Sequence, residues 1–173
     1  MDIENLVGGI MTRDAVARAW REYVAAVPTV ANDDVIVAVA SRHHDLVRSV
    51  VPADVHLVRG ENIADGADAA LVGAFAEWET GRHAVDRVVI ASCDHYFAPL
   101  ASRLRAQSVD VVQVIGIGTS STALYRACPS QIYLRTRLRG VSRSRGSAPM
   151  CRVADRVGTL TALIEQNSLS GRQ

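Results

Sequence analysis

Length, composition and charge first narrow the class of protein. The chain has 173 residues, which suits one domain with a sizeable core. Hydrophobic residues make up 49% and charged residues 21%, which excludes a largely disordered chain. The three widely spaced cysteines indicate neither a disulfide framework nor a zinc site. No apolar run is long enough to span a bilayer and no signal pattern opens the sequence, so we expect a cytoplasmic protein that does not engage membranes.

The formal net charge of +1 conceals two segments of opposite sign. Residues 1–110 contain ten arginines and sixteen acidic residues, whereas residues 111–154 contain seven arginines and no acid. Arg, Ser and Gly dominate residues 135–148, which predicts a linker there. Its arginines form a candidate surface for nucleic-acid phosphates: Arg135, Arg137, Arg139, Arg143 and Arg145. An exposed tail that contacts nothing explains the same composition equally well.

Apolar β-branched runs alternate along the chain with segments of helical periodicity. We predict strands over residues 35–40, 55–58, 87–91 and 109–115, and a weaker edge strand over 131–134. Apolar residues at helical spacing predict helices over 12–26, 43–50, 67–79 and 96–107, and a last helix within 149–173. This alternation predicts an α/β fold over residues 1–134: a three-layer, doubly wound, mostly parallel sheet with helices on both faces.

The first residues, MDIEN, stand directly before a predicted helix and have no strand ahead of them. A doubly wound sheet normally opens with a strand that is buried on both faces and reads as a β-branched run. Either this fold lacks the strand or the chain continues upstream. We expect the gene to encode about four to seven apolar residues that lead into Asp2.

Three aspartates fall where a parallel sheet gathers its functional groups. Asp2 stands where a first strand would end, Asp94 follows the strand 87–91, and Asp68 opens the helix after strand 55–58. Carboxylate oxygens favour Mg²⁺ or Mn²⁺ over zinc, and such an ion can activate water at a phosphodiester. Each aspartate alone reads as a helix cap or a loop acid. The three together predict a divalent metal site.

Four pieces of the sequence, in this order, resemble the NYN domain, a branch of the PIN-like metal-dependent ribonucleases. The family has a strand ending in D-x-x-N, then G-x-D-x-x-L, a strand ending in S-G-D-x-D-F, and S-x-x-L. The matching pieces, spread over residues 1–134, are Asp2-Ile-Glu-Asn5, Gly66-Ala-Asp68-Ala-Ala-Leu71, Ser92-Cys93-Asp94-His95-Tyr96-Phe97 and Ser121-Thr-Ala-Leu124.

The resemblance implies a PIN-like, Rossmann-like fold and hydrolysis of RNA, single-stranded in the first instance, with Mg²⁺ or Mn²⁺ as cofactor. It also implies site residues by position. Asp2, Asp68 and Asp94 become the catalytic, metal-binding carboxylates. The supporting residues that it implies are Asn5, Ser92 and Ser121.

Two positions depart from the family pattern. Cys93 replaces its glycine, and Tyr96 replaces the second aspartate of the same motif. Three aspartates can still hold one Mg²⁺, which needs few protein ligands, and Asp65 and Glu61 are nearby acids that could replace the lost one. The same loss is what an inactivated relative would show. The alternative is therefore a catalytically silent RNA-binding or regulatory module of the same fold.

Other patterns leave further alternatives open. His95, beside Asp94, suits a general base because imidazole titrates near neutrality, but also suits a surface position on the first turn of a helix. The turn at residues 116–121 resembles a phosphate-binding turn. It lacks, however, the third glycine of the dinucleotide-binding motif and the acidic residue that would bind a ribose. A homodimer, a protein partner such as an antitoxin, and the RNA target are left open by the sequence.

Overall fold

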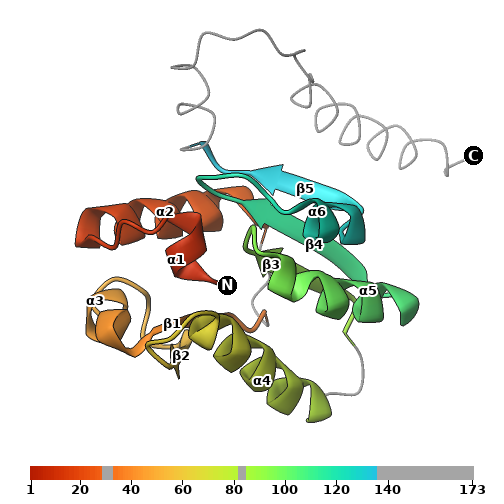
Figure 1. The fold of residues 1–173 in the computed structure, drawn as a ribbon, viewed down its shortest axis with the longest axis horizontal. Coiled ribbons are helices and arrows are strands. Elements are labelled where there is room, and N and C mark those ends of the chain that lie inside the picture. The colour runs from red at the N-terminus through yellow and green to blue at the C-terminus, as the bar shows by residue number, and fades with distance from the viewer. Residues whose placement is uncertain (29–32, 82–84, 136–173) are drawn as a thin grey trace, which may run out of the picture. The chain divides into compact units, whose positions relative to one another are not determined.

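The computed structural model describes residues 1–28, 33–81 and 85–135, in which strands and helices alternate (Figure 1). The strands are β1 (Ile36–Ala40), β2 (His56–Gly60), β3 (Arg87–Ala91), β4 (Asp110–Ile115) and β5 (Ser130–Tyr133). The helices are α1 (Ile3–Leu6), α2 (Arg13–Ala26), α3 (His44–Arg48), α4 (Gly66–Thr80), α5 (Ala98–Ala106) and α6 (Thr122–Ala127). Short 3-10 turns, η1 (Ser41–His43) and η2 (His95–Phe97), precede α3 and α5. None of these described helices is long and apolar enough to cross a membrane.

The predicted α/β fold is confirmed, and the predicted strands differ from those observed by no more than two residues at either end. Side-chain caps account for several helix starts, because they satisfy backbone N–H groups that lack a partner inside the helix. The hydroxyl of Thr12 accepts a bond from the Ala15 N–H at the start of α2, and that of Ser121 accepts one from the Leu124 N–H at the start of α6. The predicted final helix and the linker beyond Arg135 lie outside the described residues.

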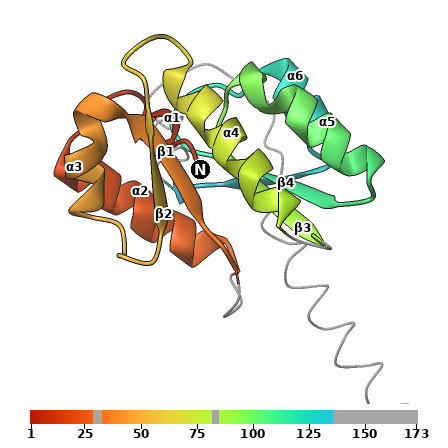
Figure 2. The same ribbon diagram turned by 90° about the horizontal axis from the view of Figure 1, so that it is seen from below.

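All strand pairs in the described part of the chain are parallel. β1 pairs with β2, while β3, β4 and β5 form a second sheet in that order. The first two residues join the two sheets. The Met1 amino group donates to the Ile36 carbonyl at 2.6 Å and the Ala38 N–H donates to the Met1 carbonyl at 2.9 Å, while the Asp2 N–H donates to the Ala91 carbonyl at 3.0 Å. The N-terminus accordingly lies between β1 and β3 in both views (Figures 1 and 2).

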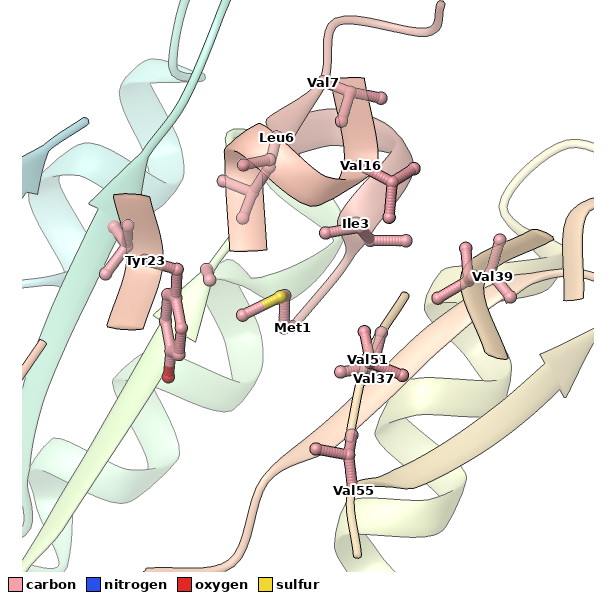
Figure 3. Packing of buried hydrophobic residues seen from close by; sticks show 14 of the residues in the cluster. Met1, Ile3, Leu6, Val7, Val16, Tyr23, Val37, Val39, Val51 and Val55 are labelled. Atoms are coloured by element: carbon pink, nitrogen blue, oxygen red, sulfur yellow. The ribbon is translucent and has the colours of Figure 1, made fainter. Parts of the chain in front are cut away.

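Two apolar cores lie on opposite faces of the strands, because successive side chains of a strand point to opposite faces. One core packs helices α1, α2 and α3 against Val37, Val39, Ala91 and Val114, and part of it is drawn in Figure 3. The other packs η2 and helices α4, α5 and α6 against Ala38, Ile90 and Val111. The molecule therefore has three layers, and the carboxyl ends of β1 and β3 meet beside Asp2.

Helix α4 begins in close backbone contact with the turn after β2, and glycine makes this possible. A Cβ on Gly66 would stand 2.4 Å from the Glu61 carbonyl oxygen, and one on Gly60 would stand 2.4 Å from the Ala67 Cα. Both obstacles are backbone, which cannot swing aside as a side chain can. Gly73, about two helical turns further along α4, is exposed and has open space around it.

The two glycines of α4 should respond to alanine in opposite directions. Gly66→Ala forces the start of α4 away from Glu61, so we expect the free energy of unfolding to fall by about 1–3 kcal/mol. Gly73→Ala removes backbone freedom from the unfolded chain at an unobstructed site and should raise it by about 0.5–1 kcal/mol. Urea unfolding of both variants measures the difference. Equal stability of the two variants would contradict the close contact at Gly66.

Candidate metal centre

Three carboxylates converge at the carboxyl end of the strands. One oxygen from each of Asp65, Asp68 and Asp94 lies within 4.8 Å of the other two. Asp68 is in the first turn of α4, and Asp94 follows β3 as the cap of η2. The structure thus brings together two of the aspartates that the sequence singled out, although they are far apart along the chain. An all-oxygen set of this kind suits a hard divalent ion such as Mg²⁺ or Mn²⁺.

Asp65 completes this cluster, and its backbone explains how. It precedes α4 in the left-handed conformation, with φ of 56°, a region that Asp tolerates better than most residues. Its side chain makes no capping bond to the helix that it precedes. The sequence raised Asp65 and Glu61 as nearby acids. The structure places Asp65 in the cluster, whereas Glu61 is absent from the described residues that line the surrounding cleft.

Asp2 lies beside the cluster, and both of its carboxylate oxygens accept hydrogen bonds from the protein. Its Oδ1 accepts a bond from the Asn5 N–H at 3.1 Å, and its Oδ2 accepts one from the Ser92 hydroxyl at 3.1 Å. The residue is only 5% exposed, and burial raises the pKa of its carboxyl although both bonds act in the opposite direction. Asp2 lines the same cleft as the other acids. Its carboxylate therefore faces the site while also capping α1.

The three residues predicted as supporting groups connect the loops that carry the acids. The Asn5 side-chain oxygen accepts a bond from the Cys93 N–H at 2.9 Å, so α1 is fixed to the loop after β3. The Ser92 hydroxyl, which donates to Asp2, accepts from the Asp94 N–H at 3.1 Å. The Ser121 N–H donates to the Cys93 carbonyl at 2.8 Å. These bonds hold Asp2 and Asp94 in a fixed relation.

Gln113 supports this loop from within β4, and the sequence analysis missed it. Its side-chain N–H₂ donates to the Ser92 carbonyl at 2.9 Å and to the Ser120 hydroxyl at 2.8 Å. The residue is fully buried, and its Oε1 has no hydrogen-bond partner among the described residues. A buried polar group normally needs such partners. The signal was present in the sequence as one amide within the apolar run that follows Asp110 in β4.

Burial, together with crowding of negative charge, strongly perturbs the pKa of Asp68. Burial is the largest cause, and the neighbouring carboxylates of Asp2, Asp94, Asp65 and Glu4 add to it, so that the pKa of Asp68 rises to about 7. Desolvation and like charges both disfavour the ionised form. A cation placed among these groups would offset both effects. Perturbed carboxylates in a cleft are typical of functional sites.

The acids line a cleft of about 400 Å³ whose rim carries two charged residues that the sequence analysis missed. Glu4 lines the cleft and its carboxylate lies 2.5 Å from Nδ1 of His43. Arg42 also lines it, next to His43 in η1, and brings a positive charge to an otherwise acidic rim. Glu4 lies within α1 and Arg42 within η1, and neither belongs to a recognisable motif, so the sequence alone gave no sign of them. Part of the candidate phosphate turn, Gly118 and Thr119, lines the same cleft.

His95 and Tyr96 have structural partners within η2. Asp94 Oδ1 accepts the Tyr96 N–H at 2.8 Å and also lies 2.8 Å from Nδ1 of His95, whose side chain is mostly exposed. The Tyr96 ring packs edge-on against Phe97 and does not line the cleft among the described residues. Tyr96 therefore leaves the position of the family's extra carboxylate without a charged group, while Asp65 brings a carboxylate from the turn before α4.

The candidate nucleic-acid arginines lie mostly beyond what the structure describes. Arg135 is exposed after β5, and Arg137, Arg139, Arg143 and Arg145 lie outside the described residues. Their role as a phosphate-binding surface remains a prediction from the sequence.

Comparison with known families gives one match. The family model of the NYN domain matches residues 10–135, a range that includes Asp68 and Asp94 and begins after Asp2. None of the curated proteins is similar to the chain at a significant level. The matched range covers most of the sequence and contains every described strand, so this chain belongs to the NYN domain family, a PIN-like nuclease family.

Proposed function

We propose that the protein is a metal-dependent ribonuclease that hydrolyses RNA phosphodiester bonds at the cluster of Asp65, Asp68 and Asp94. The observation that carries this proposal is the convergence of three carboxylates within 4.8 Å at the end of a parallel sheet. Membership in the NYN family supports a nuclease acting on RNA, and nucleases of this kind generally depend on a divalent metal. Single-stranded RNA is the proposed substrate.

Asp65, Asp68 and Asp94 would hold Mg²⁺ or Mn²⁺, and Asp2 would contact the ion directly or through a bound water. When bound, the ion supplies a Lewis acid that makes water more acidic and offsets phosphate charge. Hydrogen bonds and charges of the chain's own residues fix the geometry of the site. Asn5 and Ser92 hold the loop that carries Asp94, and the buried Asp2 adds the negative charge that makes a cation favourable.

One observation supports a second candidate function, that of an RNA-binding module without catalytic activity. Tyr96 stands where the family has an aspartate, and its ring packs on Phe97 without lining the cleft among the described residues. A site that had lost its catalytic carboxylate could bind RNA without cleaving it. Asp65 is the counter-argument, because it restores the number of acids in the cluster. Cleavage assays separate the two functions.

Asn substitution at the cluster should remove cleavage without unfolding the protein. We expect Asp68→Asn and Asp94→Asn each to lower the rate of Mn²⁺-dependent cleavage of single-stranded RNA by at least about 100-fold, since each removes a metal ligand and its charge. The thermal midpoint of the metal-free variants should equal or exceed that of the unchanged chain, because one of several repelling charges is gone.

Asp54→Asn is the matched control for this experiment. Asp54 is an exposed acid between α3 and β2 that does not line the cleft, so its loss should leave cleavage unchanged. Full activity in the Asp68 and Asp94 variants would rule out catalysis at the cluster. If the protein without substitutions binds RNA but does not cleave it with any divalent ion, the result would favour the catalytically silent RNA-binding module.

The raised pKa of Asp68 predicts how stability depends on pH in the metal-free protein. Its pKa of about 7 in the folded chain exceeds the unfolded value of 3.8, so folding takes up a proton between these limits. The contribution of this group to stability is therefore greatest below about pH 4 and is lost as the pH rises to about 7. Asp68→Asn should consequently stabilise the chain more at about pH 7.5 than at about pH 4.5.

Thermal unfolding in EDTA at the two pH values measures this difference. The Asp54→Asn control should shift the thermal midpoint by the same amount at both, since Asp54 is exposed and apart from the cluster. If Asp68→Asn also gives equal shifts at both pH values, the carboxylates do not interact as their positions imply.

The arginine segment should govern how RNA binding depends on salt. Changing Arg137, Arg139 and Arg143 to alanine should flatten the slope of log affinity against log salt by roughly two to three units, because each lost phosphate contact releases one counterion fewer. Cleavage of a short RNA held mainly at the cluster should change less than cleavage of a long one.

A triple variant in α2 controls for net charge alone. Arg13, Arg18 and Arg21 are exposed and do not line the cleft, so their change to alanine should leave the salt slope nearly unchanged. Equal slopes for the unchanged chain and the Arg137, Arg139 and Arg143 variant would show that the segment does not contact RNA.

A further inference from the structure

Arg42 brings an unpaired positive charge to the acidic cleft. Among the described residues that line the cleft it is the single cation, and five acids line the same cleft. Its side chain is exposed, and its guanidinium makes no hydrogen bond or ion pair with any other described residue. A guanidinium matches the geometry of a phosphate and can bind two of its oxygens at once. The charge of Arg42 is therefore available to an anion that enters the cleft.

Hydrogen bonds between two loops hold the backbone of Arg42 in place. Its N–H donates to Oδ1 of Asn62 at 3.0 Å, and the neighbouring Ser41 hydroxyl donates to the Gly60 carbonyl at 2.7 Å. These bonds join the loop after β1 to the loop after β2, and the second of these loops also carries Ile63. Arg42 and Ile63 therefore have a fixed relation on the same side of the acids.

Two exposed isoleucines also line the cleft. Ile63 is 66% exposed and Ile117 is 41% exposed. Ile117 packs against the end of α1, because its N–H donates to the Leu6 carbonyl at 3.2 Å and a Cβ on Gly8 would stand 3.0 Å from its Cγ2. Apolar side chains within a polar cleft suit contact with the apolar faces of bases, which every nucleotide presents.

The parallel topology sets these side chains in a row. β2, β1, the segment of Met1 and Asp2, β3 and β4 lie side by side in that order. Their carboxyl ends meet at one edge of the strands, where Ile63 follows β2, Arg42 follows β1, Asp94 follows β3 and Ile117 follows β4. Neighbouring strands lie about 4.8 Å apart, so the row covers roughly 19 Å, the length of a few nucleotides.

We propose that single-stranded RNA crosses the cleft along this row, with Arg42 bound to the phosphate next to the scissile one. Ile63 and Ile117 contact the nucleosides on either side of the metal. We call Arg42, Ile63 and Ile117 the RNA track. The RNA track rests on the proposed ribonuclease function, for which it supplies the residues that position the substrate. Bases stacked in a duplex hide their faces, so the track accepts unpaired nucleotides.

Binding of a short, labelled single-stranded RNA at several salt concentrations tests the RNA track. Ca²⁺, which also takes oxygen ligands, replaces Mn²⁺ so that binding is measured on intact RNA. Arg42→Gln should lower the affinity about tenfold and flatten the slope of log affinity against log salt by about 0.7, the value for one phosphate contact. Ile63→Ser and Ile117→Ser should each lower the affinity about threefold without changing the slope, because they remove apolar contact and no charge.

Arg59→Gln and Ile10→Ser are the matched controls. Arg59 is exposed and pairs with Asp45, Ile10 is 72% exposed, and neither residue lines the cleft. Both controls should leave affinity and salt slope nearly unchanged. In Mn²⁺-dependent cleavage, Arg42→Gln should raise KM by about the same factor as it weakens binding and should change kcat less. Binding of an RNA duplex should not depend on the residues of the track.

Several results would overturn the RNA track. They are a chain without substitutions that does not bind single-stranded RNA, equal losses in the track variants and their controls, and equal losses for single-stranded RNA and the duplex. If no chain cleaves RNA but the binding differences appear as expected, the track stands and the ribonuclease activity is wrong. If cleavage depends on the aspartates while binding and KM do not depend on Arg42, the activity stands and the track is wrong.

Discussion

The bonds made by two residues, Met1 and Asp2, are the constraint on which the rest of the structure depends. Met1 bonds to β1 and Asp2 bonds to β3, so this short segment is what joins two otherwise separate sheets. This segment also ends at the carboxyl ends of β1 and β3, which places the Asp2 carboxylate beside α4 and η2. The same geometry that closes the sheet therefore assembles the acidic cleft.

In the cleft, repulsion between the carboxylates is opposed by hydrogen bonds that fix the loops carrying them. Burial and neighbouring carboxylates raise the pKa of Asp68 to about 7, and a free cluster of this kind would spread apart. Neutral hydrogen bonds prevent this: Asn5 and Ser92 tie the loops of Asp2 and Asp94 together, and Gln113 holds Ser92 from within the core. A rigid, electrostatically unsatisfied cluster is what a divalent cation stabilises most.

The sequence predicts the fold well because buried parallel strands and amphipathic helices have periodic apolar patterns. It predicts Asp68 and Asp94 for a related reason, since both stand at element ends that parallel topology brings together. The sequence predicts the site less well where local backbone geometry determines which side chains reach it. Asp65 joins the cluster through a left-handed turn that spacing does not encode, and Gln113 acts from inside β4, the strand that pairs with β3. Such contacts depend on three-dimensional packing of segments far apart in the chain.

Mn²⁺ titration followed by electron paramagnetic resonance tests the acidic cluster most directly, because the spectrum of free Mn²⁺ is lost when the ion binds. At about pH 8, where Asp68 is ionised, the unchanged chain should bind about one Mn²⁺ and release it to excess Mg²⁺. A chain with Asn at positions 65, 68 and 94 should leave the free signal intact. Full free signal from the unchanged chain, or equal binding by both chains, would contradict a metal site built from Asp65, Asp68 and Asp94.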